Sequence, residues 1–285
     1  MSNRNPFSIQ QLLAVAYEKL ASCSDSPRLD ADVLLAWLLQ KQRSFLFTWP
    51  EQIVKNDTIA QYEALIQRRQ QGEPLAYITG VQEFWSLQLE VTRNTLIPRP
   101  ETEVLVEQAL TLIPSNKSLS ILDLGTGSGA IALAIASERP LCKITAVDNS
   151  QAALNVAKSN AARLGINNIE FLVSDWFSEL ELQVFDLIVS NPPYIAEADP
   201  HLDKLDYEPI QALCSGKFGL DDISQIIREA KHFLKPSGYL LFEHGWNQAS
   251  LISELFTEAS YSHSFSAKDL SQHFRVTGAQ FSTAI

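Results

Sequence analysis

Short apolar runs that alternate with helical segments constrain the fold of this chain more than any other feature of its sequence. The runs lie at residues 119–124, 143–147, 169–173, 185–190 and 239–242. Between them, apolar residues recur at helical spacing over residues 130–137, 151–164 and 222–234. Strands that alternate with helices are typical of an α/β fold with a doubly wound, mainly parallel sheet. We therefore expect a Rossmann-like domain in the C-terminal part of the chain.

The first 80 residues have the pattern of a small helical bundle. Ser8 and Gln11 fit a capping box at the start of a helix. Two further helices are expected at residues 29–39 and 58–71, where apolar residues again follow helical spacing.

The stretch between the two patterns alternates like a strand. Residues 84–91 are expected to form half of a hairpin, and the pair Phe84-Trp85 to pack between the bundle and the sheet. The sequence thus predicts a helical domain over residues 1–82, and a hairpin linker with the α/β domain over residues 83–285.

Charge and hydropathy narrow the set of partners. The net charge is −11, and the helical part has eight basic and eight acidic residues. Because a protein that binds nucleic-acid phosphates needs a basic surface, we expect no direct nucleic-acid binding. No apolar run approaches the roughly 18 residues of a membrane span, and the N-terminus lacks the pattern of a secretory signal. The expected location is cytoplasmic, without membrane binding.

Metal and disulfide chemistry find no support in the sequence. Cys23, Cys142 and Cys214 are scattered and lack metal-ligand spacing, so they are interpreted as reduced core thiols and no metal is expected. Glu243 and His244 follow a strand, but a single pair of this kind is interpreted as a structural hydrogen bond.

A glycine-rich loop follows the first strand of the predicted sheet and opens the next helix. Such a loop lets the backbone approach a nucleotide-like ligand. The spacing also satisfies a dinucleotide fingerprint, and Asp148, at the end of the second strand, could bind the ribose hydroxyls of either kind of cofactor. The loop residues expected to bind the cofactor are Gly125, Thr126, Gly127, Ser128 and Gly129.

The third strand ends at Ser174-Asp175-Trp176. Here the Asp175 carboxylate is placed to accept an adenine amino group, and the Trp176 indole to cover the ring.

The fourth strand ends at Asn191-Pro192-Pro193-Tyr194, on the edge of the sheet where α/β proteins bind ligands. An amide or exocyclic amine nitrogen is a poor nucleophile, because its lone pair is delocalised. The Asn191 side-chain carbonyl and the Pro192 backbone carbonyl could accept its two N–H bonds and turn the lone pair toward an electrophile. Pro193 stiffens the loop, and Tyr194 offers a flat face. The motif favours methylation of such a nitrogen from S-adenosyl-L-methionine, with S-adenosyl-L-homocysteine as the product.

Together these motifs resemble those of the bacterial peptide chain release factor glutamine methyltransferase family. The resemblance covers nearly the whole chain, including Glu83-Phe84-Trp85 and the stretch Leu-Ile-Pro-Arg-Pro-Glu-Thr-Glu at residues 96–103. Residues 98–103 are its sharper marker, whereas Asn-Pro-Pro-Tyr also occurs in adenine-specific DNA methyltransferases. The sequence departs from the family pattern around Phe218, Ile223, Ser224, Gln272 and Phe274.

The resemblance implies methyl transfer to the glutamine side-chain amide of the Gly-Gly-Gln motif in class I peptide chain release factors. It implies that the glycine loop, Asp148 and Trp176 bind S-adenosyl-L-methionine, with Asn191 at the junction of the cofactor and the substrate. It also implies that residues 191–194 hold the glutamine and that the helical domain docks the protein substrate. A glutamine of a ribosomal protein and an exocyclic amine of a nucleic-acid base remain alternatives.

Overall fold

The computed structural model describes residues 7–181 and 183–282, with no side chain described at positions 203 and 204. Contacts divide the chain into two compact units, Met1–Val81 and Gln82–Ile285. Each unit has its own buried core. No helix in the described ranges is both long enough and apolar enough to cross a membrane.

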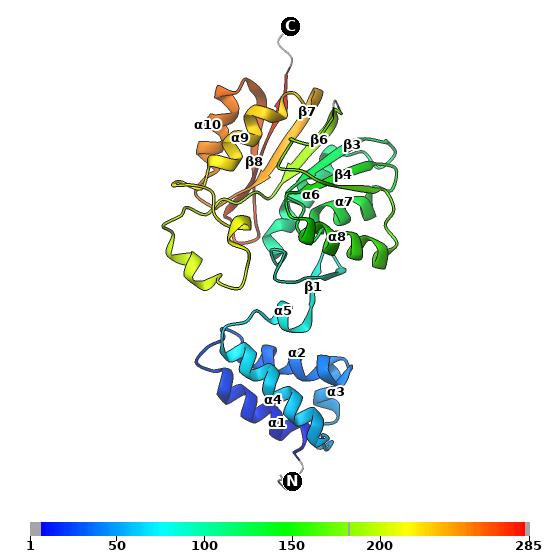
Figure 1. The fold of residues 1–285 in the computed structure, drawn as a ribbon, viewed down its shortest axis with the longest axis vertical. Helices are drawn as coiled ribbons and strands as arrows, with labels where there is room; N and C mark the ends of the chain where they lie inside the picture. Colours follow the sequence, from blue (N-terminus) through cyan, green and yellow to red (C-terminus); the bar gives the residue numbers. More distant parts are fainter. Residues whose placement is uncertain (1–6, 182, 283–285) are drawn as a thin grey trace. The chain divides into compact units, whose positions relative to one another are not determined.

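The first unit is a bundle of helices (Figure 1). Ser8 caps the first helix as predicted: its Oγ accepts from the Gln11 backbone N–H, and the Gln11 side chain accepts from the Ser8 N–H. Two short helices were not predicted from the sequence, because neither has a full apolar period. The helices are α1 (Ile9–Leu20), α2 (Pro27–Leu39), α3 (Arg43–Thr48), α4 (Asn56–Gln70) and α5 (Leu75–Thr79).

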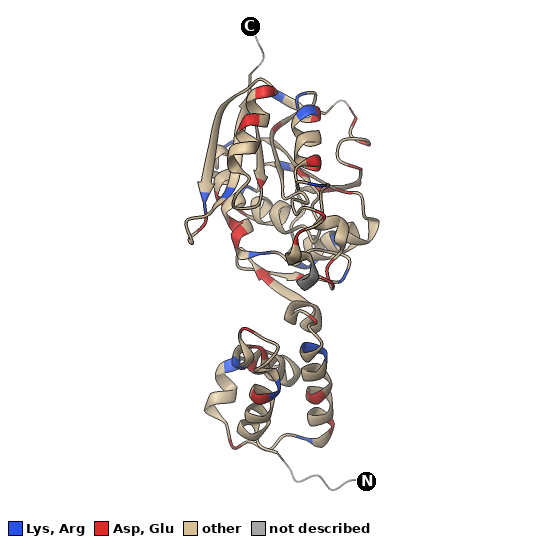
Figure 2. Ribbon diagram, turned by 90° about the vertical axis from the view of Figure 1, so that its left-hand side faces the viewer, with Lys and Arg blue, Asp and Glu red and all other residues tan. Residues whose placement is uncertain are grey.

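Acidic and basic residues both occur along the helices of the first unit. Figure 2 shows acidic and basic residues interspersed on its helices. Several of them pair: Arg69 bonds Asp30 at 2.7 Å, and Arg43 bonds Asp32 at 3.2 Å. Because these guanidinium groups are paired with buried carboxylates, they are less available to bind the phosphates of a nucleic acid.

The second unit is built on a seven-stranded sheet in the order β5-β4-β3-β6-β7-β9-β8, in which only β9 runs antiparallel to its neighbours. This confirms the predicted α/β fold with a mainly parallel sheet. The strands are β3 (Ser120–Leu124), β4 (Lys143–Asp148), β5 (Ile169–Val173), β6 (Phe185–Ser190), β7 (Leu234–Glu243), β8 (Tyr261–Lys268) and β9 (Phe274–Phe281).

Helices cover both faces of this sheet (Figure 1). Successive strand residues point to opposite faces, so Ile121 packs into one core and Leu122 into the other. Side chains from α6, α7 and α8 enter the Ile121 core, and those from α9 and α10 enter the Leu122 core. The sheet is therefore doubly wound. The helices are α6 (Glu103–Leu112), α7 (Ala130–Glu138), α8 (Gln151–Leu164), α9 (Asp221–Ala230) and α10 (Ala249–Glu258).

The structure corrects the prediction for residues 84–91. They do not form one strand but the end of β1 (Val81–Phe84), a turn, and β2 (Leu87–Glu90). Trp85 and Ser86 make the turn with φ angles of 52° and 58°, the conformation that a two-residue hairpin requires. Phe84 packs in the core of the second unit, which corrects its expected place between bundle and sheet.

Two further expectations were wrong. The helix expected over residues 222–234 ends at Ala230, because the apolar residues that extend its period belong to a strand: Leu234 begins β7 and pairs with Phe185. Cys23 is exposed and is not a core thiol, whereas Cys142 is buried and Cys214 half-buried. All three are free, as expected.

Candidate active site

The glycine loop connects β3 to α7 at the carboxyl edge of the sheet. Gly127 and Gly129 both have positive φ, at 56° and 85°. A Cβ on Gly127 would meet no atom within 4 Å, so this residue is open to the cavity beside it. A Cβ on Gly129 would lie 3.0 Å from Leu133 and 3.2 Å from Ala157. Gly129 therefore permits the close packing of α7 on α8, and it is not among the residues that line the cavity.

Asp148 holds the glycine loop from the end of β4. Its Oδ2 accepts from the Gly127 backbone N–H at 2.8 Å, and its Oδ1 accepts from the Ser150 N–H at 2.9 Å. Burial raises the pKa of this carboxyl, and these two bonds offset part of the rise. Each oxygen keeps a lone pair, so Asp148 can still accept hydrogen bonds from a ligand in the cavity that it lines.

Asp123 supports the same loop from beneath. It is fully buried, and its Oδ2 accepts from the Thr126 hydroxyl at 2.7 Å and from the Ala132 N–H at 3.2 Å. Burial raises its pKa to about 7. Sequence reasoning gave Asp123 no role of its own, although its place at the end of a buried strand, before the glycines, was visible.

Asp175 and Trp176 follow β5 and line the cavity. Asp175 is exposed, which leaves its carboxylate free for a ligand. Trp176 has a φ of 47°, and its six-membered ring lies 3.5 Å from the point where a Cβ on Gly125 would stand. The indole therefore lies against the glycine loop, on the same side of the cavity.

The Asn-Pro-Pro-Tyr loop follows β6, which lies beside β3 in the sheet. Asn191 and Pro193 line the cavity. Pro192 is buried, and Tyr194 packs against the α9–α10 core, with its backbone oxygen accepting from Gln248 at 3.1 Å. Neither Pro192 nor Tyr194 is among the cavity-lining residues, so their contacts with a substrate stay predictions.

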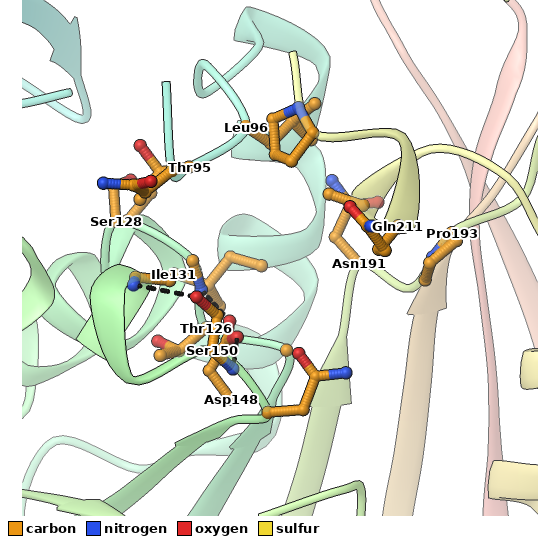
Figure 3. A pocket seen from close by; sticks show the side chains of 18 of the residues that line it. Thr95, Leu96, Thr126, Ser128, Ile131, Asp148, Ser150, Asn191, Pro193 and Gln211 are labelled. Atoms are coloured by element: carbon orange, nitrogen blue, oxygen red, sulfur yellow. Dashed lines mark hydrogen bonds between the residues drawn. The ribbon is translucent and has the colours of Figure 1, made fainter. Parts of the chain in front are cut away.

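One cavity of about 530 Å³ brings the two loops together. Figure 3 shows Thr126, Ser128, Asp148 and Ser150 on one side of it, and Asn191, Pro193 and Gln211 on the other. This volume lies within the usual range for small-molecule sites, about 300–1,000 Å³.

A second set of cavity-lining residues escaped sequence reasoning. Half of them lie in two segments, residues 93–98 and 209–212, which carry no periodic pattern, and the others are spread over the rest of the second unit. The first segment was visible only as part of a family marker, and the second gave no signal. The unpredicted lining residues are Arg93, Asn94, Thr95, Leu96, Pro98, Thr102, Ala130, Ile131, Asn149, Ser150, Ala153, Ser174, Pro209, Gln211, Ala212 and Asp222.

Glu208 ties these two segments to each other. It is buried, and its carboxylate accepts from the Ile97 backbone N–H at 3.1 Å and from the Arg99 guanidinium. The Arg93 guanidinium lies 5.1 Å from the centre of the Tyr207 ring. These contacts hold together two segments that line the cavity.

Glu243 and His244, at the end of β7, are buried behind the Asn-Pro-Pro-Tyr loop. Both ring nitrogens of His244 are hydrogen-bonded, to the Gly245 carbonyl and to the Thr277 hydroxyl, each at 2.8 Å. His244 is therefore held by structural hydrogen bonds, but the Glu243–His244 bond expected from the sequence was wrong. Glu243 does not bond His244; its Oε1 accepts from the Tyr194 hydroxyl at 3.5 Å.

A glycine loop and a facing polar loop at the carboxyl edge of the sheet form a ligand site of the kind that doubly wound α/β proteins use, and comparison with known families shows that the domain is a methyltransferase domain. A family model described as "Methyltransferase domain" matches residues 115–280, and one described as "PrmC N-terminal domain" matches residues 11–80. Among solved structures, a methyltransferase from Pyrococcus furiosus superposes with a TM-score of 0.54 at 18% identity, over 79% of this chain and all of that one. This likeness supports the fold alone.

The family follows from close relatives. A release factor glutamine methyltransferase of Shewanella oneidensis is 47% identical over 271 residues, 94% of each chain. One of Escherichia coli is 48% identical over 89% of this chain and 92% of that one, and one of Coxiella burnetii is 46% identical over 92% and 95%. The chain belongs to the release factor glutamine methyltransferase family, as the sequence motifs indicated.

Proposed function

We propose that this protein transfers a methyl group from S-adenosyl-L-methionine to the side-chain amide nitrogen of the glutamine in the Gly-Gly-Gln motif of class I peptide chain release factors. The observation that carries the proposal is that Asn191 shares one cavity with the glycine loop. Membership of the family supports the choice of a glutamine over other nitrogen substrates. The free cysteines fit the reducing cytoplasm in which we place the reaction.

The residues of the cavity fit this cofactor. Asp148 keeps lone pairs for ribose hydroxyls, Asp175 offers an exposed carboxylate to an adenine amino group, and Trp176 offers an aromatic face. Gly127 leaves open space where a side chain would stand. When bound, the cofactor supplies a methyl group on a sulfonium centre that is already a good leaving group.

In this proposal the protein contributes mainly orientation. The Asn191 side-chain oxygen and the Pro192 backbone oxygen each accept one N–H of the substrate amide, which directs the nitrogen lone pair toward the glycine-loop side of the cavity. Holding two reacting groups in line can lower a barrier by roughly 7–11 kcal/mol. No strong base is needed at the outset, because the nitrogen becomes acidic only as the new bond forms.

A transfer assay separates this function from its alternatives. The protein is incubated with labelled S-adenosyl-L-methionine and a class I release factor, the same factor with the Gly-Gly-Gln glutamine replaced by alanine, ribosomal proteins, or DNA. We expect label on the unmodified factor alone. Label that persists on the alanine variant, or that appears on DNA or a ribosomal protein instead, would contradict the proposal.

We also propose that the helical unit contacts the protein substrate. Phe47, Trp49 and Ile53 lie within seven residues of the sequence and expose between 55% and 60% of their surface, and neighbouring exposed apolar side chains are typical of protein-binding surfaces. Replacing Trp49 with alanine is expected to raise KM for the release factor and to leave KM for a short Gly-Gly-Gln peptide unchanged. An equal effect on both substrates would argue against docking by this unit.

A further inference from the structure

Glu243 occupies an unusual position for an acid. It is 1% exposed, at the carboxyl end of β7, and its Oε2 has no hydrogen-bond partner among the described residues. An ionised carboxylate in such a place is costly unless it is paired, so its presence calls for an explanation. The Tyr194 hydroxyl donates to its Oε1 at 3.5 Å, and the Thr102 hydroxyl is close enough to lower its pKa.

Thr102 connects Glu243 to the cavity. Its hydroxyl is near enough to the Glu243 carboxyl to lower the pKa of that group, and its Oγ1 lies 3.5 Å from the side-chain nitrogen of Asn191. Both Thr102 and Asn191 line the cavity, whereas Glu243 lies behind it. Thr102 ends η1 (Pro100–Thr102), Glu243 ends β7, and Asn191 follows β6. The fold therefore brings together three residues that are far apart in the sequence.

The direction of these bonds decides how the Asn191 amide is turned. A threonine hydroxyl has one proton, and an ionised carboxylate can only accept. When Thr102 donates that proton to Glu243, its oxygen can only accept from Asn191. The Asn191 NH₂ group must then face Thr102, and its carbonyl oxygen faces away, free for the substrate.

We propose that Glu243, acting through Thr102, is the positioning residue that presents the carbonyl oxygen of Asn191, and not its NH₂ group, to the substrate nitrogen. This inference rests on the proposed function, because a substrate amide offers N–H groups that only the carbonyl end can accept. Glu243 itself touches no reacting atom.

Protonation of Glu243 would reverse the donor and acceptor roles in the hydrogen bonds from Glu243 through Thr102 to Asn191. A protonated carboxyl can donate to Thr102, whose proton is then released to bond the Asn191 oxygen, which turns the amide over. The pKa of Glu243 is raised to about 7: burial is the largest cause and Glu101 adds to it, while Thr102, Arg275 and Tyr194 offset part of the rise. Arg99 lowers the pKa of Tyr194, whose hydroxyl contacts Glu243. Turnover is therefore expected to fall as the pH decreases through about 7.

The first test compares Thr102→Val with Thr102→Ser. Valine removes the hydroxyl at nearly constant volume, and serine keeps it. We expect kcat with the release factor to fall roughly 10-fold in the valine variant, the usual effect of one lost orienting hydrogen bond. The serine variant should restore most of it, and the Kd of the cofactor, measured by calorimetry, should not change in either.

The second test is the pH profile of kcat between pH 5.5 and 8.5. The wild-type profile should rise through about pH 7, and Glu243→Gln, which does not titrate, should lose this limb. Glu101→Gln is the matched control: it removes a nearby charge without touching the bond chain, so the limb should move to lower pH and persist.

A third measurement does not depend on activity. In the protein without added ligand, the side-chain ¹⁵N resonance of Asn191, assigned by its loss in Asn191→Asp, should titrate with the same midpoint as kcat. It should not titrate in Glu243→Gln. Wild-type turnover in the Thr102→Val variant, or an unchanged pH limb in Glu243→Gln, would overturn the inference. Absence of any methyl transfer by the wild-type protein would refute the proposed function instead.

Discussion

Replacing Gly129 with alanine is expected to destabilise the second unit more than replacing Gly127. Both substitutions force a side chain into left-handed backbone, at a cost of roughly 1–2 kcal/mol each. At Gly127 nothing else is disturbed, because the added Cβ meets open space. At Gly129 the Cβ would lie 3.0 Å from Leu133 and 3.2 Å from Ala157, which adds an overpacking cost of about 1–3 kcal/mol.

Equilibrium urea unfolding of each variant, followed by circular dichroism, measures this difference. The free energy of unfolding should be lower for Gly129→Ala by about 1–3 kcal/mol relative to Gly127→Ala. Cofactor affinity should respond in the opposite order, because Gly127 lines the cavity and Gly129 does not. Equal losses of stability, or a larger loss at Gly127, would refute the view that Gly129 serves the packing of α7 on α8.

Three further predictions concern the acids and the amide of the site. Asn191→Ala should abolish methyl transfer and leave calorimetric cofactor binding intact; undiminished turnover would refute its role. Asp148→Asn should weaken cofactor binding, because an NH₂ group would replace one of two oxygens that accept backbone N–H bonds; unchanged calorimetric affinity would contradict this. The last prediction concerns stability against pH. Because the folded-state pKa of Asp123 is raised to about 7, the folded protein holds this proton more tightly than the unfolded chain, and stability should fall as the pH rises from 4 to 7. Asp123→Asn should make this decline shallower without removing it, since Glu243 contributes in the same direction; an unchanged slope in thermal melts across this range would count against it.

Periodic patterns predicted the parts of the fold that depend on local sequence. The strands β3, β4, β5 and β6 and the capped helix at Ser8 were found because a buried parallel strand is a continuous apolar run and a capping box is a local bond. The helix after residue 222 was extended too far, because apolar spacing alone does not show that Leu234 pairs with a neighbouring strand.

The site was predicted less completely, for a physical reason. Asp148, Trp176 and Asn191 lie at or just after the ends of strands, so the rule that ligands bind at the carboxyl edge of the sheet found them. Thr95 lies in an irregular segment and Gln211 in the short 3-10 helix η3 (Ile210–Ala212); the place of both at the cavity depends on Glu208 and its long-range bonds to residues 97 and 99. No local pattern encodes such a contact.

The pairing of β3 with β6 sets the spacing between the glycine loop and Asn191. Leu124 and Ser190 are register partners, and the Ser190 hydroxyl donates to the Leu124 carbonyl at 2.8 Å. The glycine loop and Asn191 therefore start from points separated by one interstrand spacing, about 4.8 Å. A slip of one residue in this pairing would turn Asn191 to the opposite face of the sheet. The distance between the cofactor side and the substrate side of the cavity is therefore set by the hydrogen bonds of the sheet. The surrounding loops do not have to fix it.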